Sequence, residues 1–252
     1  MITVHMLLQK KGGVGKSMTA SMWMQFLNEM GYPVAGFDTD PSNHTFADFT
    51  ELGVTHVDVV DENDEIDQRR FDNLVETICR QKTDEHIIID TGSSCFQSLF
   101  SYLKHNKPFD LLKSFGHQIY AHTLIAGGGD FAHTTASLVA LVKEFPDIPF
   151  IVWKNRYHGE LSFNNQTFEQ LDYYPIVKDH IKATINIPLK NAKTFGADIE
   201  YLMATKLTFR SAGKSSMPMM VQQRLNLFWI ELCEAMKEGL VFDKPAKKAK
   251  EA

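Results

Sequence analysis

The chain has 252 residues, of which 44% are hydrophobic and 23% are charged, and its formal net charge is −5. This is ordinary globular composition, and the length suits one large α/β domain or two small ones whose core needs no disulfide or metal. The mild negative charge argues against attraction of the whole domain to nucleic acid, although it does not exclude a local basic patch.

Short apolar runs rich in β-branched residues alternate with longer stretches that have helical spacing. We expect strands at 2–8, 32–38, 54–60, 85–90, 117–126, 148–155 and 183–189. Helices are expected at 17–31, at 68–81, from near Asp130, and at 217–242. This alternation predicts a three-layer α/β fold, in which a mostly parallel, twisted sheet carries helices on both faces. Functional residues then belong at the carboxyl ends of the strands.

The domain organisation is expected to be simple. No repeat or linker-like composition interrupts residues 1–242, so we expect a single domain there. The last residues, 243–252, are polar and rich in lysine, which is typical of a disordered tail. Three scattered cysteines, with no C-x-x-C pair, indicate reduced thiols in a cytoplasmic protein.

A glycine-rich loop, KGGVGKS, joins the first expected strand to the first expected helix. Gly12, Gly13 and Gly15 let backbone N–H groups approach phosphate oxygens without a Cβ in the way. The positive end of the helix dipole adds to the attraction for an anion. In this context we expect Lys16 to bridge the terminal phosphates of a nucleotide and Ser17 to place its hydroxyl on Mg²⁺.

Carboxylates follow two further strands. Asp38 and Asp40 lie at the end of the second strand, and residues two apart on a strand share a face. Asp90 ends the fourth strand, in IIIDTG. Three acids at strand ends, together with a phosphate loop, predict a site for a magnesium–nucleotide complex.

These motifs resemble those of the deviant Walker A ATPases, the ParA/MinD group of P-loop NTPases. KGGVGKS matches the signature of that group, and DTDPSN and IIIDTG are similar to its two switch motifs. The resemblance implies that Lys11 reaches across an ATP-bridged homodimer to the phosphates of the partner. Lys10 occupies the position of the missing glycine, and we expect it to be exposed. The resemblance also implies that Asp40 positions the attacking water, and that Asp38 and Asp90 organise the hydrated Mg²⁺.

The same resemblance extends to the nucleobase. WKNRY is similar to the strand-to-N-R junction of the group, which would bring Asn155 to the adenine, and NIPLK resembles the turn that would place Pro188 beside the base. The remaining expected nucleotide-binding residues are Lys11, Gly12, Gly13, Val14, Gly15, Lys16, Ser17 and Met18.

The sequence departs from the group in three places. Met18 stands where a threonine hydroxyl usually meets the α-phosphate, Ser42 replaces a glutamine, and Gly92 and Ser93 replace a pair of prolines. Within the group, the order of HMLLQKKGGVGKS, DTDPSNHTF, GHQIYAHTLIAGG and FIVWKNRY is most similar to the TraL-type ATPases of conjugative plasmids.

The expected function is therefore that of a slow ATPase switch with ATP and Mg²⁺ as cofactors, acting in plasmid conjugal transfer or DNA segregation. Three alternatives stay open: a small-molecule kinase or amidoligase of the same superfamily, a non-hydrolysing nucleotide sensor, which Met18 favours, and an iron–sulfur reductase. The last would need a second cysteine near Cys95, and the sequence has none there.

Partners are expected to include a second copy of the chain with ATP and an unidentified protein. Non-specific DNA is a further candidate, because basic residues recur in the tail and at Lys206, Arg210 and Lys214. The helix at 217–242 carries three glutamates among its polar residues, so we expect it to cover the core and not to bind a membrane.

Overall fold

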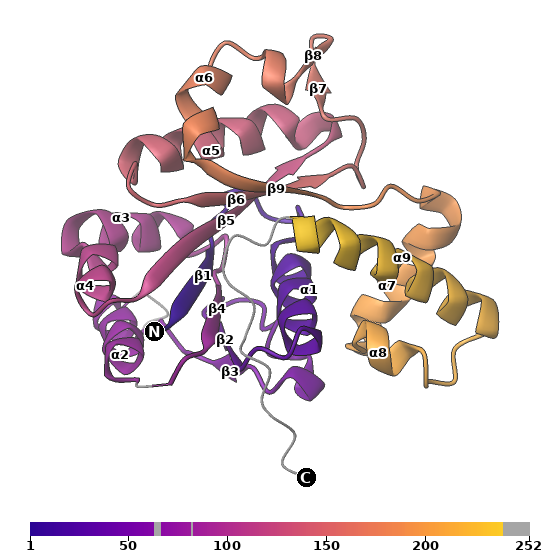
Figure 1. Ribbon diagram of the computed structural model, residues 1–252, viewed down its shortest axis with the longest axis horizontal. Helices are drawn as coiled ribbons and strands as arrows, with labels where there is room; N and C mark the ends of the chain where they lie inside the picture. The colour runs from indigo at the N-terminus through magenta and orange to yellow at the C-terminus, as the bar shows by residue number, and fades with distance from the viewer. Residues whose placement is uncertain (63–66, 82, 239–252) are drawn as a thin grey trace.

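The computed structural model describes residues 1–62, 67–81 and 83–238. Its centre is a seven-stranded sheet with the order β3-β2-β4-β1-β5-β6-β9, and all neighbouring strands are parallel (Figure 1). The strands are β1 (Thr3–Leu7), β2 (Val34–Asp38), β3 (Thr55–His56), β4 (His86–Asp90), β5 (Gln118–Ala126), β6 (Phe150–Asn155) and β9 (Ile181–Asn186). A separate hairpin pairs β7 (Ser162–Phe163) with β8 (Gln166–Thr167).

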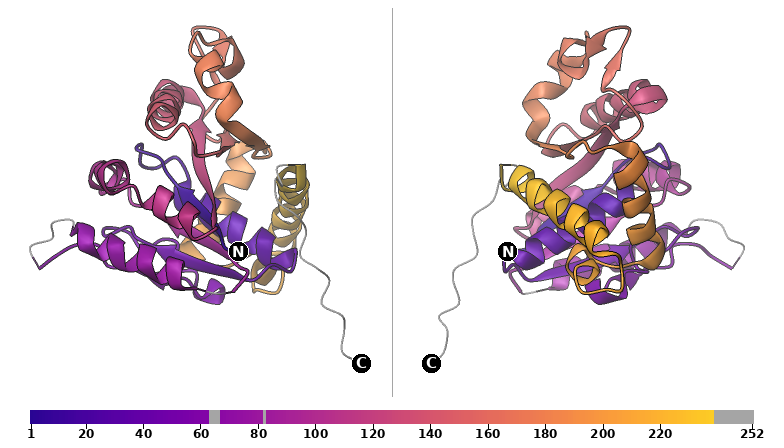
Figure 2. Two further views of the ribbon diagram at one scale, coloured as in Figure 1. Left: turned by 60° about the vertical axis from the view of Figure 1, so that its left-hand side comes forward. Right: turned by 90° about the vertical axis from the view of Figure 1, so that its right-hand side faces the viewer.

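Helices cover both faces of this sheet, as Figures 1 and 2 show. One layer holds α1 (Lys16–Glu29), α7 (Ala192–Thr205), α8 (Phe209–Ala212) and α9 (Met219–Glu238). The other holds α2 (Gln68–Arg80), α3 (Phe96–Asn106), α4 (Pro108–Ser114), α5 (Phe131–Glu144) and α6 (Tyr174–Val177). Short 3₁₀ turns lie at Thr50–Leu52, Gly128–Asp130, Phe168–Gln170 and Lys178–His180. The expected three-layer α/β fold is confirmed.

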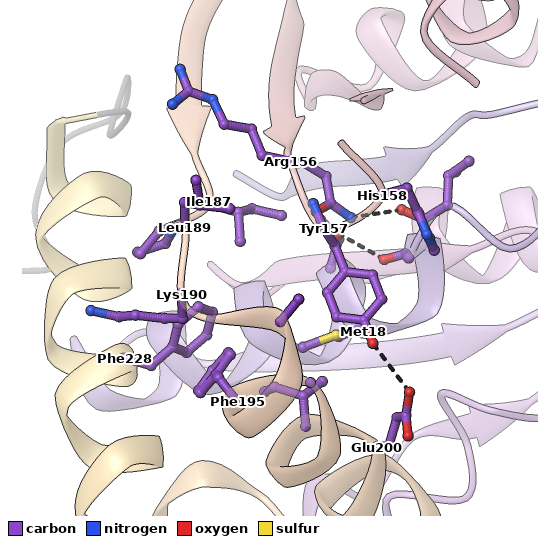
Figure 3. A pocket seen from close by; sticks show the side chains of 18 of the residues that line it. Met18, Arg156, Tyr157, His158, Ile187, Leu189, Lys190, Phe195, Glu200 and Phe228 are labelled. Carbon is purple, nitrogen blue, oxygen red and sulfur yellow. Dashed lines mark hydrogen bonds between the residues drawn. The ribbon is translucent and has the colours of Figure 1, made fainter. Parts of the chain in front are cut away.

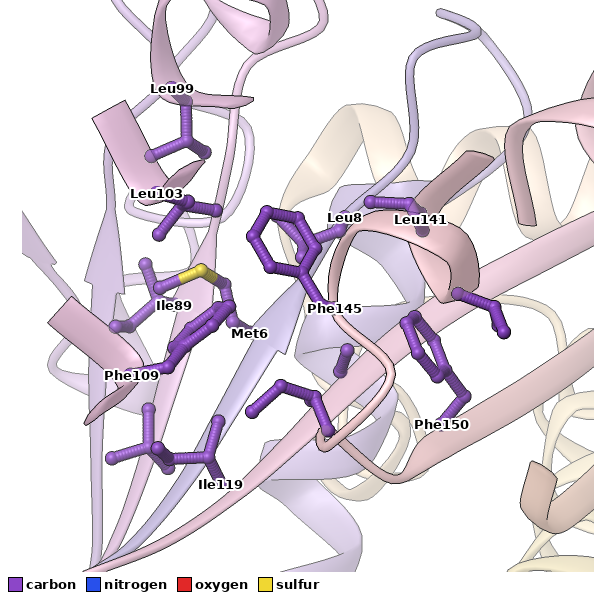
Figure 4. Close-up of a cluster of buried hydrophobic side chains, with 14 of the residues drawn as sticks. Met6, Leu8, Ile89, Leu99, Leu103, Phe109, Ile119, Leu141, Phe145 and Phe150 are labelled. Atoms are coloured by element: carbon purple, nitrogen blue, oxygen red, sulfur yellow. The ribbon is translucent and has the colours of Figure 1, made fainter. Parts of the chain in front are cut away.

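Two hydrophobic clusters, one on each face of the sheet, form the core. Met6 and Leu8 of the β1 region point into the cluster beneath α3, α4 and α5 (Figure 4), whereas Leu7 belongs to the cluster beneath α1 and α9. This alternation follows from the two-residue period of a strand. The expectation that the last helix covers the core is confirmed, because Phe228 and Leu232 of α9 are buried in the second cluster.

Several expected boundaries were wrong. The third strand, expected at 54–60, is only two residues long, because β3 lies at the edge of the sheet and pairs with β2 alone. The last strand begins at Ile181, two residues before its expected start, and ends at Asn186. Residues 239–242 of the last expected helix and the tail at 243–252 lie outside the described residues.

A chain of hydrogen bonds between buried histidines runs through the sheet. The indole Nε1–H of Trp153 donates to Nδ1 of His122 at 3.0 Å, Nε2 of His122 lies 2.9 Å from Nδ1 of His5, and Nε2 of His5 lies 2.9 Å from Nδ1 of His86. Because an indole can only donate, each histidine in turn accepts at Nδ1 and donates from Nε2. Burial lowers the pKa of His86 to about 4 and of His122 to about 3, so these imidazoles are neutral.

Within the described ranges, no helix is long and apolar enough to cross a membrane. Nor do three or more histidine, cysteine, aspartate or glutamate side chains gather there into a group that could hold a metal ion by themselves.

Candidate functional site

The register of the sheet brings the expected site residues together at the carboxyl ends of its central strands. Leu7, which precedes the glycine-rich loop, is paired with Asp90 of β4, and Asp90 is paired in turn with Asp38 of β2. The two carboxylates therefore flank the start of the loop at the carboxyl ends of neighbouring strands, where open α/β sheets bind ligands.

The glycine-rich loop has the backbone of an anion cradle. Gly13 and Gly15 have φ angles of 76° and 98°, which L side chains rarely adopt, and Gly15 caps α1 without any side-chain hydrogen bond to the helix. The first N–H groups of α1 are therefore available to a ligand. At its start the loop is held by Gln9, a buried side chain that accepts from the backbone N–H of Lys11 and donates to the carbonyl of Leu124.

Lys16 and Asp90 form a buried pair beneath this cradle. Lys16 Nζ lies 3.5 Å from Asp90 Oδ1, and the two side chains are 8% and 0% exposed. Burial is the largest effect on the Asp90 carboxyl and raises its pKa to about 6, although Lys16 and a hydrogen bond from Ser17 oppose this shift. Asp90 Oδ2 is buried without a hydrogen-bond partner, so the pair has spare capacity for a cation or a water molecule.

Asp38 and Asp40 hold the loop that follows β2. Asp38 accepts from the backbone N–H groups of Asp40, Phe46 and Ala47, and it is completely buried. Both of its oxygens are thus engaged with the protein, which makes Asp38 an organiser of this loop.

Asp40 lies against Gly92. One of its oxygens accepts from the N–H groups of Ser42 and Asn43, and a Cβ added at Gly92 would lie 2.8 Å from the carboxyl carbon of Asp40. Glycine therefore makes room for Asp40 at position 92, where the group usually has a proline.

Lys11 is exposed and turned toward its own chain. Its Nζ lies 3.2 Å from Asp130 Oδ1, and the side chains of the two residues are 44% and 29% exposed. The helix expected from near Asp130 begins at Phe131, and the Asp130 side chain makes no capping hydrogen bond to it. Lys10, as expected, is also exposed.

A pocket of about 630 Å³ opens beside the loop and is lined by Gly13, Val14, Gly15, Met18, Asn155 and Pro188 among others. The amide of Asn155 donates to the carbonyl of Val14 at 3.1 Å and accepts from the N–H of Tyr157 at 3.0 Å. Asn155 therefore ties the glycine-rich loop to the segment after β6. Met18 presents a thioether to the pocket. The hydroxyl of its neighbour Thr19 donates a hydrogen bond to the carbonyl of Gly15.

Three features of this region were not found by reasoning from the sequence: Gln9, the ion pair of Asp130 with Lys11, and Tyr157. Gln9 offered a signal, since a glutamine directly after a buried strand is unusual. Tyr157 lines the pocket and donates from its hydroxyl to Glu200 at 3.1 Å. Burial, followed by the Glu200 carboxylate, raises the pKa of this phenol, which therefore stays protonated.

Cys95 is buried, and its thiol lies 3.3 Å from the carbonyl of Gly92 and 3.8 Å from that of Thr39. Burial raises its pKa to about 11, so the free thiol is protonated at neutral pH.

The CobQ/CobB/MinD/ParA nucleotide binding domain matches residues 6–216 of the chain. Protein TraL of Escherichia coli is 36% identical over 243 residues, which cover 96% of this chain and 100% of that protein.

The solved structures of similar fold include two MinD proteins that each cover 96% of this chain. The MinD cell division protein of Aquifex aeolicus has a TM-score of 0.52 at 16% identity, with 99% of that chain covered. The septum site-determining protein MinD of Pyrococcus horikoshii, complexed with Mg-ADP, has a TM-score of 0.50 at 13% identity, with 100% of that chain covered. The resemblance expected from the motifs is confirmed.

Proposed function

Because the chain belongs to the CobQ/CobB/MinD/ParA family of nucleotide-binding domains, we propose that it is an ATP-dependent switch. It binds ATP with Mg²⁺, forms a homodimer around the nucleotide and hydrolyses ATP slowly. The resemblance to the TraL-type ATPases supports a role in plasmid conjugal transfer or DNA segregation, in the cytoplasm.

One observation carries this proposal: the glycine-rich loop leads directly to a buried lysine–carboxylate pair with an unsatisfied oxygen. The backbone N–H groups of a loop with positive-φ glycines and of a helix N-terminus attract phosphate oxygens. A carboxylate oxygen without a hydrogen-bond partner suits a hydrated divalent cation. The residues present therefore fit a magnesium–nucleotide complex, with Ser17 as the direct ligand and Asp38 and Asp90 behind it.

The reaction uses few side chains. Lys16 binds the terminal phosphates, Asp40 orients the attacking water, and Lys11 of the partner protomer stabilises the negative charge that develops during phosphoryl transfer. Mg²⁺, when bound with the nucleotide, neutralises charge on the phosphate oxygens. The dimer is favoured by ATP because each Lys11 gains a phosphate partner only across the interface.

Binding partners follow from the same dimer. We propose that its surface recruits an unidentified protein and retain non-specific DNA as a candidate, with Arg210 and Lys214 exposed. Lys206 contributes less, because it pairs with Asp48 at 3.2 Å. The other expected DNA-binding lysines, in the tail, lie outside the described residues.

The test is nucleotide binding and turnover by matched variants. Lys16→Ala should abolish ATP binding, whereas Lys10→Ala, an exposed neighbour, should bind normally. Asp40→Ala should bind ATP but stop hydrolysis, and so accumulate as an ATP-bound dimer on size exclusion. Unchanged ATP affinity in Lys16→Ala would contradict the assignment of the loop.

A second candidate, a nucleotide sensor that does not hydrolyse ATP, is favoured by Met18, since the pocket offers no hydroxyl at this position. Phosphate release from the wild-type protein with saturating ATP separates the two functions.

A further inference from the structure

An aromatic ring stands in the pocket beside the glycine-rich loop. Figure 3 shows Tyr157 on one side of the pocket and Ile187, Leu189 and Phe195 on the other, and Met18 lines the same pocket. Tyr157 is 43% exposed although it lies within a concave site. An aromatic side chain that stays accessible in a pocket provides a flat apolar surface for a ligand.

The hydroxyl end of this ring is fixed to α7. Tyr157 donates to Glu200 at 3.1 Å, and a Cβ added at Gly196 would lie 3.3 Å from the phenol oxygen. Gly196 therefore lets the ring lie close against the helix, and Glu200 sets its orientation.

The backbone of the Tyr157 segment is fixed as well. Its N–H group donates to the side chain of Asn155, and the segment then packs backbone to backbone against the loop after β5. A Cβ added at Gly127 would lie 1.9 Å from the carbonyl oxygen of Gly159, and one at Gly128 would lie 2.3 Å from that of His158. Only glycines permit this approach, and hydrogen bonds from the N–H groups of Gly127 and Gly128 to the carbonyls of Asn155 and Glu160 hold the segment beside the pocket.

We propose that Tyr157 is a preformed stacking surface for the nucleobase, and that Glu200 positions it. This inference rests on the proposed function, because it assumes that the phosphates occupy the glycine-rich loop. The base then lies between the Tyr157 ring and the apolar wall formed by Ile187, Leu189 and Phe195.

This contact favours ligands that carry a nucleobase. Every nucleobase has a π-face, so stacking adds affinity for any nucleoside triphosphate without selecting between adenine and guanine. It adds nothing for an inorganic polyphosphate, which has no base. Base–aromatic stacking is worth about a 5- to 150-fold change in Kd.

The test measures the binding of ATP, GTP and inorganic tripolyphosphate, each with Mg²⁺, by isothermal titration calorimetry. Tyr157→Leu should raise the Kd for ATP and for GTP to the same degree, by about 5- to 150-fold, and leave the Kd for tripolyphosphate unchanged. Tyr157→Phe keeps the ring but loses its hydrogen bond to Glu200, so it should weaken ATP binding by as much as Glu200→Ala and by less than Tyr157→Leu. The matched control is Tyr201→Leu, because Tyr201 is 51% exposed on α7, next to Glu200, and does not line the pocket.

Glu200 acts only through the ring, and a double-mutant cycle tests this. Glu200→Ala should weaken ATP binding in the wild-type background and have no further effect in Tyr157→Leu. An equal loss in both backgrounds would mean that Glu200 contacts the ligand by itself, against the positioning role.

The outcomes separate the two proposals. If wild type binds ATP and Lys16→Ala does not, but Tyr157→Leu binds ATP as wild type does, the stacking role is wrong and the proposed function stands. A Tyr157→Leu variant that loses tripolyphosphate and ATP equally also overturns the stacking role. If wild type binds neither ATP nor tripolyphosphate, the proposed function itself fails.

Discussion

The variant Asp130→Asn removes the carboxylate that holds Lys11 within its own protomer. The two groups are 3.2 Å apart and 44% and 29% exposed, and such a partly exposed ion pair contributes about 0.2–1 kcal/mol. If Lys11 must leave Asp130 to reach the phosphates of its partner, both pairs open in every dimer. The variant should then favour the ATP-bound dimer by about 0.4–2 kcal/mol, which lowers its Kd by about 2- to 30-fold.

Sedimentation equilibrium with saturating ATP measures this dimer constant, and ADP serves as the reference state. Asp110→Asn is the matched control, because it removes the same charge from an exposed position in the first turn of α4. In the Lys11→Ala background, which should not dimerise with ATP, Asp130→Asn should not restore the dimer. A dimer constant that is unchanged or weakened in Asp130→Asn would refute the idea that this pair opposes dimerisation.

Three further predictions concern the site and the core. Gly92→Ala should retain ATP binding but slow phosphate release by about 100-fold, because the new methyl group displaces Asp40; normal turnover would contradict the packing argument. Met18→Thr should lower the Kd for ATP by about tenfold through a hydroxyl bond to the α-phosphate, and calorimetry that shows no gain would count against it. Because the pKa of His86 is lowered to about 4 and that of His122 to about 3, both stay neutral in the folded state while the unfolded chain takes up protons below its pKa of about 6.5. The two histidines therefore make their full contribution to the free energy of unfolding above about pH 6.5, and this contribution should fall by about 4 kcal/mol at pH 5. Urea unfolding at pH 7 and pH 5 checks this.

The sequence predicts the framework of the fold because its signals are local. β-Branched runs such as IIID become central strands, and the period of the apolar residues identifies α1, α2 and α9. The rule that sites lie at the carboxyl ends of parallel strands places Asp38 and Asp90 beside the loop, and the register of β1, β2 and β4 confirms that they are neighbours.

What sequence reasoning missed depends on contacts between distant segments. The end of β3 is decided by its place at the sheet edge. Helix α7 carries Gly196 within the helix and Tyr201 on its exposed side, and both weaken the amphipathic pattern that would identify it. The role of Tyr157 needs the approach of two glycine-containing loops, and the histidine chain needs the strand order. Neither can be derived from spacing along one segment.

Multi-angle light scattering of wild type and Lys11→Ala without nucleotide, with ADP and with ATP measures whether ATP joins two protomers through Lys11. Wild type should have the 28.7 kDa mass of one chain without nucleotide and with ADP, and twice that mass with ATP. Lys11→Ala should bind ATP and yet keep the mass of one chain. A wild-type protein that stays monomeric with ATP, or a Lys11→Ala variant that dimerises as readily as wild type, would contradict ATP-dependent dimerisation through Lys11.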